Sequence, residues 1–195
     1  MAEITTELIK ALRDETGISV MQVKKALEEA GGDTEKAKVI LRKTSSAIAA
    51  KKGDRELGAG VAAAYVHAGG QVVGAIVLSC ETDFVSRNPE FSALAYDIAM
   101  HVAAMKPVFK SKDDVTEENL RAARDVFTTE AANVPEAKRE IAIQGKLDAY
   151  IAERALLEQP FVKNGDVTIR ELIDQAVQKF GEKVEVTRFE RLSVK

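Results

Sequence analysis

Two apolar runs that contain β-branched residues, separated by a short glycine-containing segment, constrain the fold of this chain most strongly. The runs cover 61–66 and 72–78, and His67-Ala68-Gly69-Gly70-Gln71 separates them, which is the pattern of a β-hairpin. Helical periodicity precedes and follows this pair, and a last strand is predicted over 183–192. Because strands and helices are grouped rather than alternating, the sequence predicts an α+β fold with a small antiparallel sheet packed by helices.

Three helices are predicted before the hairpin. Gly17 is a typical stop for the first helix, and Ser19 is a typical N-cap for the second. Asp33 can cap the third helix, which is predicted to end near Lys43, where a Thr-Ser-Ser sequence breaks the apolar pattern. Three short helices predict a minimal helical bundle, and we assign it to a separate N-terminal domain of residues 1–45.

The remainder of the chain is predicted to contain a connection and a larger body. Residues 46–59 are alanine-rich and then charged, which fits a linker or a helical extension. In the α+β body of residues 60–195, Pro89 can begin a helix, Thr116 can cap a second and Pro135 suits the first turn of a third.

Charge and cysteine content limit the classes of partner and compartment. The chain has 28 basic and 31 acidic residues, so its net charge of -3 gives no global case for binding nucleic acid or an anionic membrane. Cys80 is the single cysteine and is expected to be a buried thiol in a reducing compartment. The sequence has no export-signal pattern and no apolar run near the ~20 residues that span a bilayer. We therefore expect a cytoplasmic protein.

The sequence lacks the usual motifs of cofactor, metal and catalytic sites. It contains no Gly-x-x-x-x-Gly-Lys-Ser/Thr phosphate loop, and two histidines with one cysteine do not make a recognisable zinc site. Glu81 and Asp83 stand directly after the predicted strand, and we do not favour them as an acid and a base acting on one bond. We expect no cofactor, no metal and no catalytic residue; an acid/base enzyme that uses this pair is the least favoured hypothesis.

Two aromatic side chains are candidates for contact with a partner protein. Phe84 follows Asp83 in a loop between an apolar strand and a helix, a position that often carries function. Either it is a wedge, a side chain that inserts into a partner, or it folds back and caps the core. His101 projects about 70° from the middle of the apolar stripe of its helix, so it is expected at the margin between core and surface. It either contacts a partner or is satisfied by a local hydrogen bond.

An ordered set of motifs resembles one known family. The motifs, in chain order, are Ile4 to Leu12, Thr16 to Leu27, Thr82-Asp83-Phe84-Val85, Ile98-Ala99-Met100-His101-Val102-Ala103 and Gln159-Pro160-Phe161-Val162. Together they resemble bacterial elongation factor Ts. The resemblance implies a guanine-nucleotide exchange factor of translation elongation, which releases GDP from elongation factor Tu so that GTP can bind. Such a factor is not itself a GTPase, in agreement with the missing phosphate loop.

The resemblance also implies a set of partner-binding residues. The N-terminal bundle would be a ubiquitin-associated-like head that docks on the nucleotide-binding domain of the partner through Leu12, Val20 and Met21. The alternative is that these three form the core of the head, and for Leu12 both roles are compatible.

Two further contacts are implied in the body. The wedge would lie near the magnesium and phosphate site of the partner and consists of Thr82, Asp83, Phe84 and Val85. His101 would belong to a second face that touches another domain of the partner.

The sequence departs from the longer members of the family. The Thr-Asp-Phe-Val motif occurs once, and no long heptad segment follows it. It therefore resembles a short form, for which the family implies a homodimer in which two chains replace the missing half. The competing function is that of a non-catalytic adaptor, whose head binds helical or ubiquitin-like ligands while the body only dimerises.

Overall fold

The computed structural model describes residues 4–194 of the chain, which folds into two compact units. The first unit contains Met1–Ala63, Val77–Tyr96 and Arg170–Thr187, and the second contains Ala64–Ile76, Asp97–Ile169 and Arg188–Lys195. The boundaries between the units fall inside strands and inside helices.

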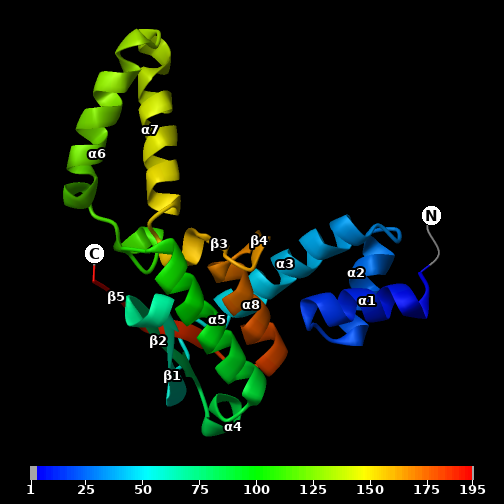
Figure 1. Cartoon of the computed structure of the whole chain (residues 1–195). Coiled ribbons are helices and arrows are strands. Elements are labelled where there is room, and N and C mark those ends of the chain that lie inside the picture. Colours follow the sequence, from blue (N-terminus) through cyan, green and yellow to red (C-terminus); the bar gives the residue numbers. More distant parts are fainter. Residues whose placement is uncertain (1–3, 195) are drawn as a thin grey trace. The chain divides into compact units, whose positions relative to one another are not determined.

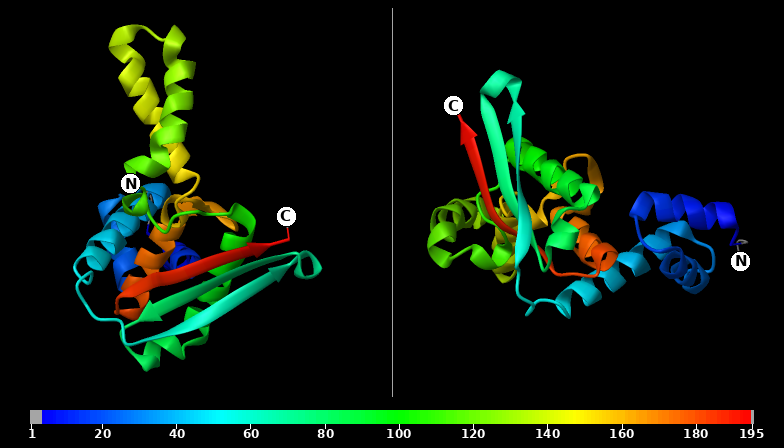
Figure 2. Two further views of the ribbon diagram at one scale, coloured as in Figure 1. Left: turned by 90° about the vertical axis from the view of Figure 1, so that its left-hand side faces the viewer. Right: turned by 90° about the horizontal axis from the view of Figure 1, so that it is seen from below.

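The first unit begins with the predicted three-helix head. Its helices are α1 (Thr6–Thr16), α2 (Val20–Glu29) and α3 (Thr34–Ala50) (Figures 1 and 2). The predicted stop and caps are confirmed: Gly17 adopts a left-handed φ of 68° after α1, and the side chains of Ser19 and Asp33 accept hydrogen bonds from the first turns of α2 and α3. The head has its own core, formed by Leu12, Ile18, Val23, Ala26, Leu27, Ala37 and Leu41.

Helix α3 does not end near Lys43, so that prediction is wrong. The hydroxyl groups of Thr44 and Ser45 donate to the carbonyl oxygens four residues earlier, at 2.9 and 3.0 Å, and thus do not interrupt the helix. Helix α8 (Ile169–Phe180) stabilises this part of α3, because Ser45 is buried against Gln178 and the Ser46 hydroxyl donates to Asp174 at 2.6 Å. The part of α3 that extends beyond Lys43 therefore packs against α8 within the first unit.

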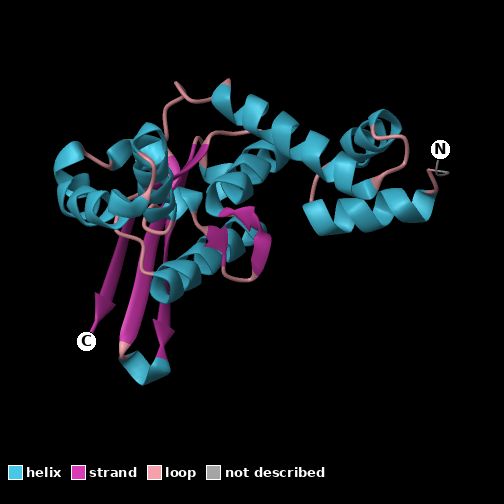
Figure 3. Cartoon of the chain, turned by 90° about the horizontal axis from the view of Figure 1, so that it is seen from above, coloured by secondary structure: helices cyan, strands magenta, loops and turns pink. Residues whose placement is uncertain are grey.

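The sheet confirms the α+β fold. Strands β1 (Ala59–His67), β2 (Val72–Cys80) and β5 (Val184–Ser193) form one sheet in the order β1-β2-β5 (Figure 3). The predicted hairpin and last strand are therefore present. Helix α5 (Pro89–Met105) begins at the predicted proline, and in the second unit it packs closely on β2. A Cβ atom added at Gly74 would collide with the backbone of Ala99 and Ala103.

The second unit also contains a helical hairpin and a small strand pair. Helices α6 (Glu117–Glu130) and α7 (Glu136–Ala152) lie side by side (Figure 1) and share a core of Leu120, Ala131, Ile143 and Leu147. Strand β3 (Pro160–Phe161) pairs antiparallel with β4 (Asn164–Thr168). No helix within residues 4–194 combines the length and apolar character that crossing a bilayer requires.

Candidate functional site

The Thr-Asp-Phe-Val motif forms a short projecting element between β2 and α5. Residues 83–86 make one helical turn, α4 (Asp83–Ser86), and we call residues 82–86 the tip. The amides of Ser86 and Arg87 donate to the carbonyl oxygens of Thr82 and Asp83, which closes the turn. Phe84 is 84% exposed, whereas Val85 is only 3% exposed. The tip therefore packs through Val85 and presents Phe84 to solvent.

Buried residues support the base of the tip. Cys80, at the end of β2, is fully buried, as the sequence predicts, and its thiol contacts the carbonyl oxygen of Thr82 at 3.2 Å. Burial raises the pKa of the Cys80 thiol, so the group is the inert, protonated form. After the tip, Phe91 is buried and meets Phe180 edge to face, with ring centroids 5.8 Å apart. The exposed Phe84 ring therefore lies between two segments that are anchored by buried residues, Cys80 before the tip and Phe91 after it.

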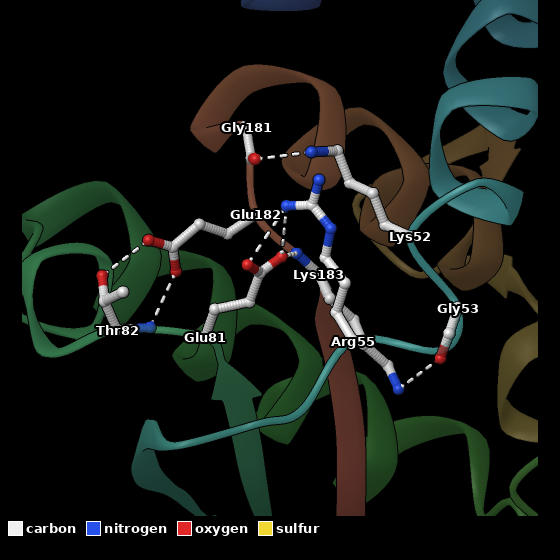
Figure 4. A network of polar contacts seen from close by, with 8 residues as sticks. All are labelled: Lys52, Gly53, Arg55, Glu81, Thr82, Gly181, Glu182 and Lys183. Atoms are coloured by element: carbon white, nitrogen blue, oxygen red, sulfur yellow. Dashed lines mark hydrogen bonds and ion pairs between the residues drawn. The ribbon is translucent and has the colours of Figure 1, made fainter.

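Carboxylate groups fix the tip from the side (Figure 4). Both oxygens of Glu182 accept hydrogen bonds from Thr82, one from the backbone amide at 2.9 Å and one from the hydroxyl at 2.6 Å. Glu81 accepts from the backbone amide of Lys183 at 2.5 Å and from Arg55 at 3.1 Å. The Lys183 amide, and then the Arg55 guanidinium, hold the pKa of Glu81 below its ordinary value.

Asp83 is placed differently from Glu81. Its side chain is exposed and forms a 2.9 Å ion pair with Arg87, one turn later. Glu81 is occupied by Lys183 and Arg55, so the two carboxylates do not converge on a common point. Within residues 4–194, no group of three or more histidine, cysteine or acidic side chains is arranged to hold a metal ion.

The three head residues separate into two groups. Val20 and Met21 begin α2 and are 53% and 75% exposed, which fits docking better than core packing. Leu12 is buried in the head core next to Ile18, which precedes the exposed pair. Leu12 thus belongs to the core on which the segment between α1 and α2 packs, and its contact with a partner remains a prediction.

His101 does not lie at the margin of the core, so the predicted position is wrong. The side chain has 0% exposure, because the segment around β3 covers that flank of α5 in the second unit. The Val162 amide donates to Nδ1 at 3.2 Å, so Nε2 carries the proton and donates to Oε1 of Gln159 at 2.9 Å. Burial lowers the pKa of His101, although the bond to Gln159 opposes this shift.

Sequence reasoning missed Glu182. This residue lies 100 positions after Thr82, in the connection between α8 and β5. A Glu-Lys pair after a glycine resembles an ordinary charged turn, and no periodicity distinguishes it. Only the three-dimensional fold brings this carboxylate to the tip.

The fold and the site define an α+β protein in which the tip and the start of α2 carry exposed apolar side chains. Comparison with known sequences identifies the family. A family model described as Elongation factor TS matches residues 21–195. Elongation factor Ts of Desulforamulus reducens is 42% identical over 193 residues, covering 98% of this chain and 89% of that protein. Elongation factor Ts of Rubrobacter xylanophilus is 45% identical over 187 residues, covering 95% of this chain and 96% of that protein.

A third relative extends the match almost to the full length of both chains. Elongation factor Ts of Pseudothermotoga lettingae is 41% identical over 194 residues, which cover 98% of each chain. The chain belongs to the elongation factor Ts family, and its role is that of a translation elongation factor.

Proposed function

We propose that this chain is a guanine-nucleotide exchange factor that accelerates GDP release from elongation factor Tu. The observation that carries the proposal is the 84% exposure of Phe84 on a tip with a buried base. Burying this ring in a partner would remove its apolar surface from water, which is favourable. Insertion of Phe84 near the nucleotide would bring the Asp83 carboxylate towards the magnesium and phosphate contacts, where its charge would compete with the phosphates.

Energetics require more than the tip. A thousandfold faster release corresponds to a barrier lower by about 4 kcal/mol. Burying Phe84 in a partner supplies only about 1.5–3 kcal/mol. Exchange is also a reciprocal coupling, so the factor weakens GDP binding only as much as GDP weakens binding of the factor. Other surfaces must therefore contribute binding energy while the nucleotide site is distorted.

The head is the first of these surfaces in our proposal. Val20 and Met21 would dock on the nucleotide-binding domain of elongation factor Tu, with residues 1–45 acting as a ubiquitin-associated-like docking domain. Their exposure also suits the alternative function, an adaptor whose head binds helical or ubiquitin-like ligands. The exchange function requires the tip, whereas the adaptor function does not.

The body supplies the second surface. We propose that the helix of His101 contacts another domain of the partner, with the buried ring acting through the segment it supports. Residues 60–195 would also pair two chains into a homodimer, and residues 46–59 would connect head and body. As an exchange factor, the protein would be a non-enzymatic cytoplasmic component of protein biosynthesis that binds neither nucleic acid nor membrane directly.

Release of a fluorescent GDP analogue from elongation factor Tu tests the proposal. Wild-type protein should accelerate release strongly, and Phe84→Ala should remove about 1.5–3 kcal/mol of this effect, a factor of about 10 to 150. No acceleration by the wild type would refute the exchange function. Strong acceleration that is unchanged in Phe84→Ala would keep the function but remove the tip from its mechanism.

A further inference from the structure

The contact between Glu182 and Thr82 links two loops that are far apart in the sequence. Glu182 follows Gly181, whose φ of 73° lets the chain turn sharply after α8. Its carboxylate receives the amide and the hydroxyl of Thr82 at 2.9 and 2.6 Å. Thr82 is the N-cap residue of α4, but its hydroxyl makes no capping bond to the helix. The Thr82 hydroxyl therefore donates to Glu182 and does not cap α4.

Residues next to Glu182 and Thr82 form further hydrogen bonds between the same parts of the chain (Figure 4). Lys183 donates its backbone amide to Glu81 and its side-chain ammonium group to the Gly53 carbonyl oxygen at 2.7 Å. Lys52 donates to the Gly181 carbonyl oxygen at 2.6 Å. The segment that follows α3, the end of α8 and the residues before the tip are thus joined by polar contacts within one unit.

A single helical turn cannot hold its own shape in water, because helix nucleation is unfavourable. The tip is one turn long, and both Asp83 and Phe84 project into solvent. External contacts must therefore set the direction of the turn. Val85 anchors its buried side, and Glu182 fixes the backbone where the turn begins.

We propose that Glu182 is a positioning residue for nucleotide exchange, which holds the tip so that Phe84 projects in the direction needed for insertion. This inference rests on the proposed function. Glu182 touches neither nucleotide nor partner in this role; it acts through Thr82 on Phe84. Holding the tip before binding removes the ordering cost that a mobile tip would add to insertion.

The first test measures GDP release from elongation factor Tu as a function of factor concentration. Glu182→Ala should lower the maximal release rate about tenfold, the effect of losing a charge-assisted contact, while the half-saturating concentration stays close to the wild type. Glu190→Ala is the matched control, because Glu190 is an exposed glutamate on β5 that pairs with Arg188. Equal maximal rates for Glu182→Ala and wild type would overturn the proposal.

A conservative variant and a double variant separate positioning from general damage. In Glu182→Gln, the amide oxygen can accept from the Thr82 amide while the NH₂ group donates to the Thr82 hydroxyl oxygen, so the rate should recover to within about twofold of wild type. Adding Glu182→Ala to Phe84→Ala should cause no further loss, because the residue acts through Phe84. Additive losses in the double variant would contradict this role.

Amide hydrogen exchange of the free protein gives a readout that does not depend on nucleotide release. The Thr82 amide should exchange faster in Glu182→Ala than in wild type and should be unchanged in Glu190→Ala. Unchanged exchange at Thr82 would refute the positioning role even if release were slower. If wild-type protein failed to release GDP while Thr82 behaved as expected, the proposed function would fall and the structural role of Glu182 would stand.

Discussion

Phe84 and His101 are aromatic residues in opposite environments. Phe84 is 84% exposed on a one-turn helix, whereas His101 has 0% exposure in the middle of α5. The ring of His101 uses both nitrogen atoms in hydrogen bonds, to Val162 and to Gln159. Phe84 is thus free to bind another molecule, and His101 is committed to holding its own unit together.

The hydrogen bonds around His101 extend its effect to three parts of the second unit. Gln159 accepts from the ring and donates its amide protons to the carbonyl oxygens of Met105 and Glu153, at 3.3 and 2.7 Å. The end of α5, the end of α7 and the segment leading into β3 therefore meet at one buried glutamine. Any role of His101 in partner binding passes through this network, while Phe84 can act directly.

The largest expected difference between the two residues is in folding stability. His101→Ala should lower the free energy of unfolding by about 2–4 kcal/mol, because it leaves a cavity and unpaired buried polar groups at Gln159 and Val162. Urea unfolding followed by circular dichroism measures this loss. A change below about 0.5 kcal/mol, the usual range of surface substitutions, would contradict the committed role of the ring.

The outcome for these residues shows what the sequence alone could predict. Local signals were sufficient for the starts of α2 and α3, because Ser19 and Asp33 cap these helices through residues three positions later. Long-range contacts were not predictable. The margin position of His101 followed from α5 alone, but residues about 60 positions later cover it. Likewise, the motif suggested Phe84, while Glu182, its support, carries no local signature.

The second expected effect concerns Met21, which is exposed like Phe84 but lies in the head. Met21→Ser should raise the half-saturating concentration in GDP release about tenfold, the cost of losing one buried apolar side chain at an interface. The free energy of unfolding should be unchanged. Val39→Ser is the control, because Val39 is an exposed apolar residue elsewhere on the head. Unfolding of the Met21 variant would instead assign this residue to the core.

The third effect is the pH dependence of stability. The folded-state pKa of His101 is lowered, so below the unfolded pKa of about 6.5 the unfolded chain binds more protons than the folded chain. Stability should therefore fall as pH decreases from about 7 to 5, with a contribution from His101 of at most about 1.4 kcal/mol per pH unit.

Variants of the two histidines assign this pH dependence. His101→Asn should flatten the slope, and His67→Gln, at an exposed position, should retain it. Urea unfolding at several pH values measures both slopes. The same slope in wild type and His101→Asn would show that other groups cause the acid sensitivity.

The smallest expected effect is that of Phe84→Ala on folding. Val85, and not Phe84, is the buried apolar residue of the tip. Removing the Phe84 ring should therefore change the free energy of unfolding by less than about 0.5 kcal/mol. Urea unfolding tests this, with Val85→Ala as the contrast, since truncating that buried neighbour should cost about 1–2 kcal/mol. A loss in Phe84→Ala as large as in Val85→Ala would mean that the ring packs on its own chain in solution. A near-zero change together with slower nucleotide release would assign the energy of Phe84 to the partner, because a side chain that contributes nothing to its own fold can affect exchange only through what it contacts outside.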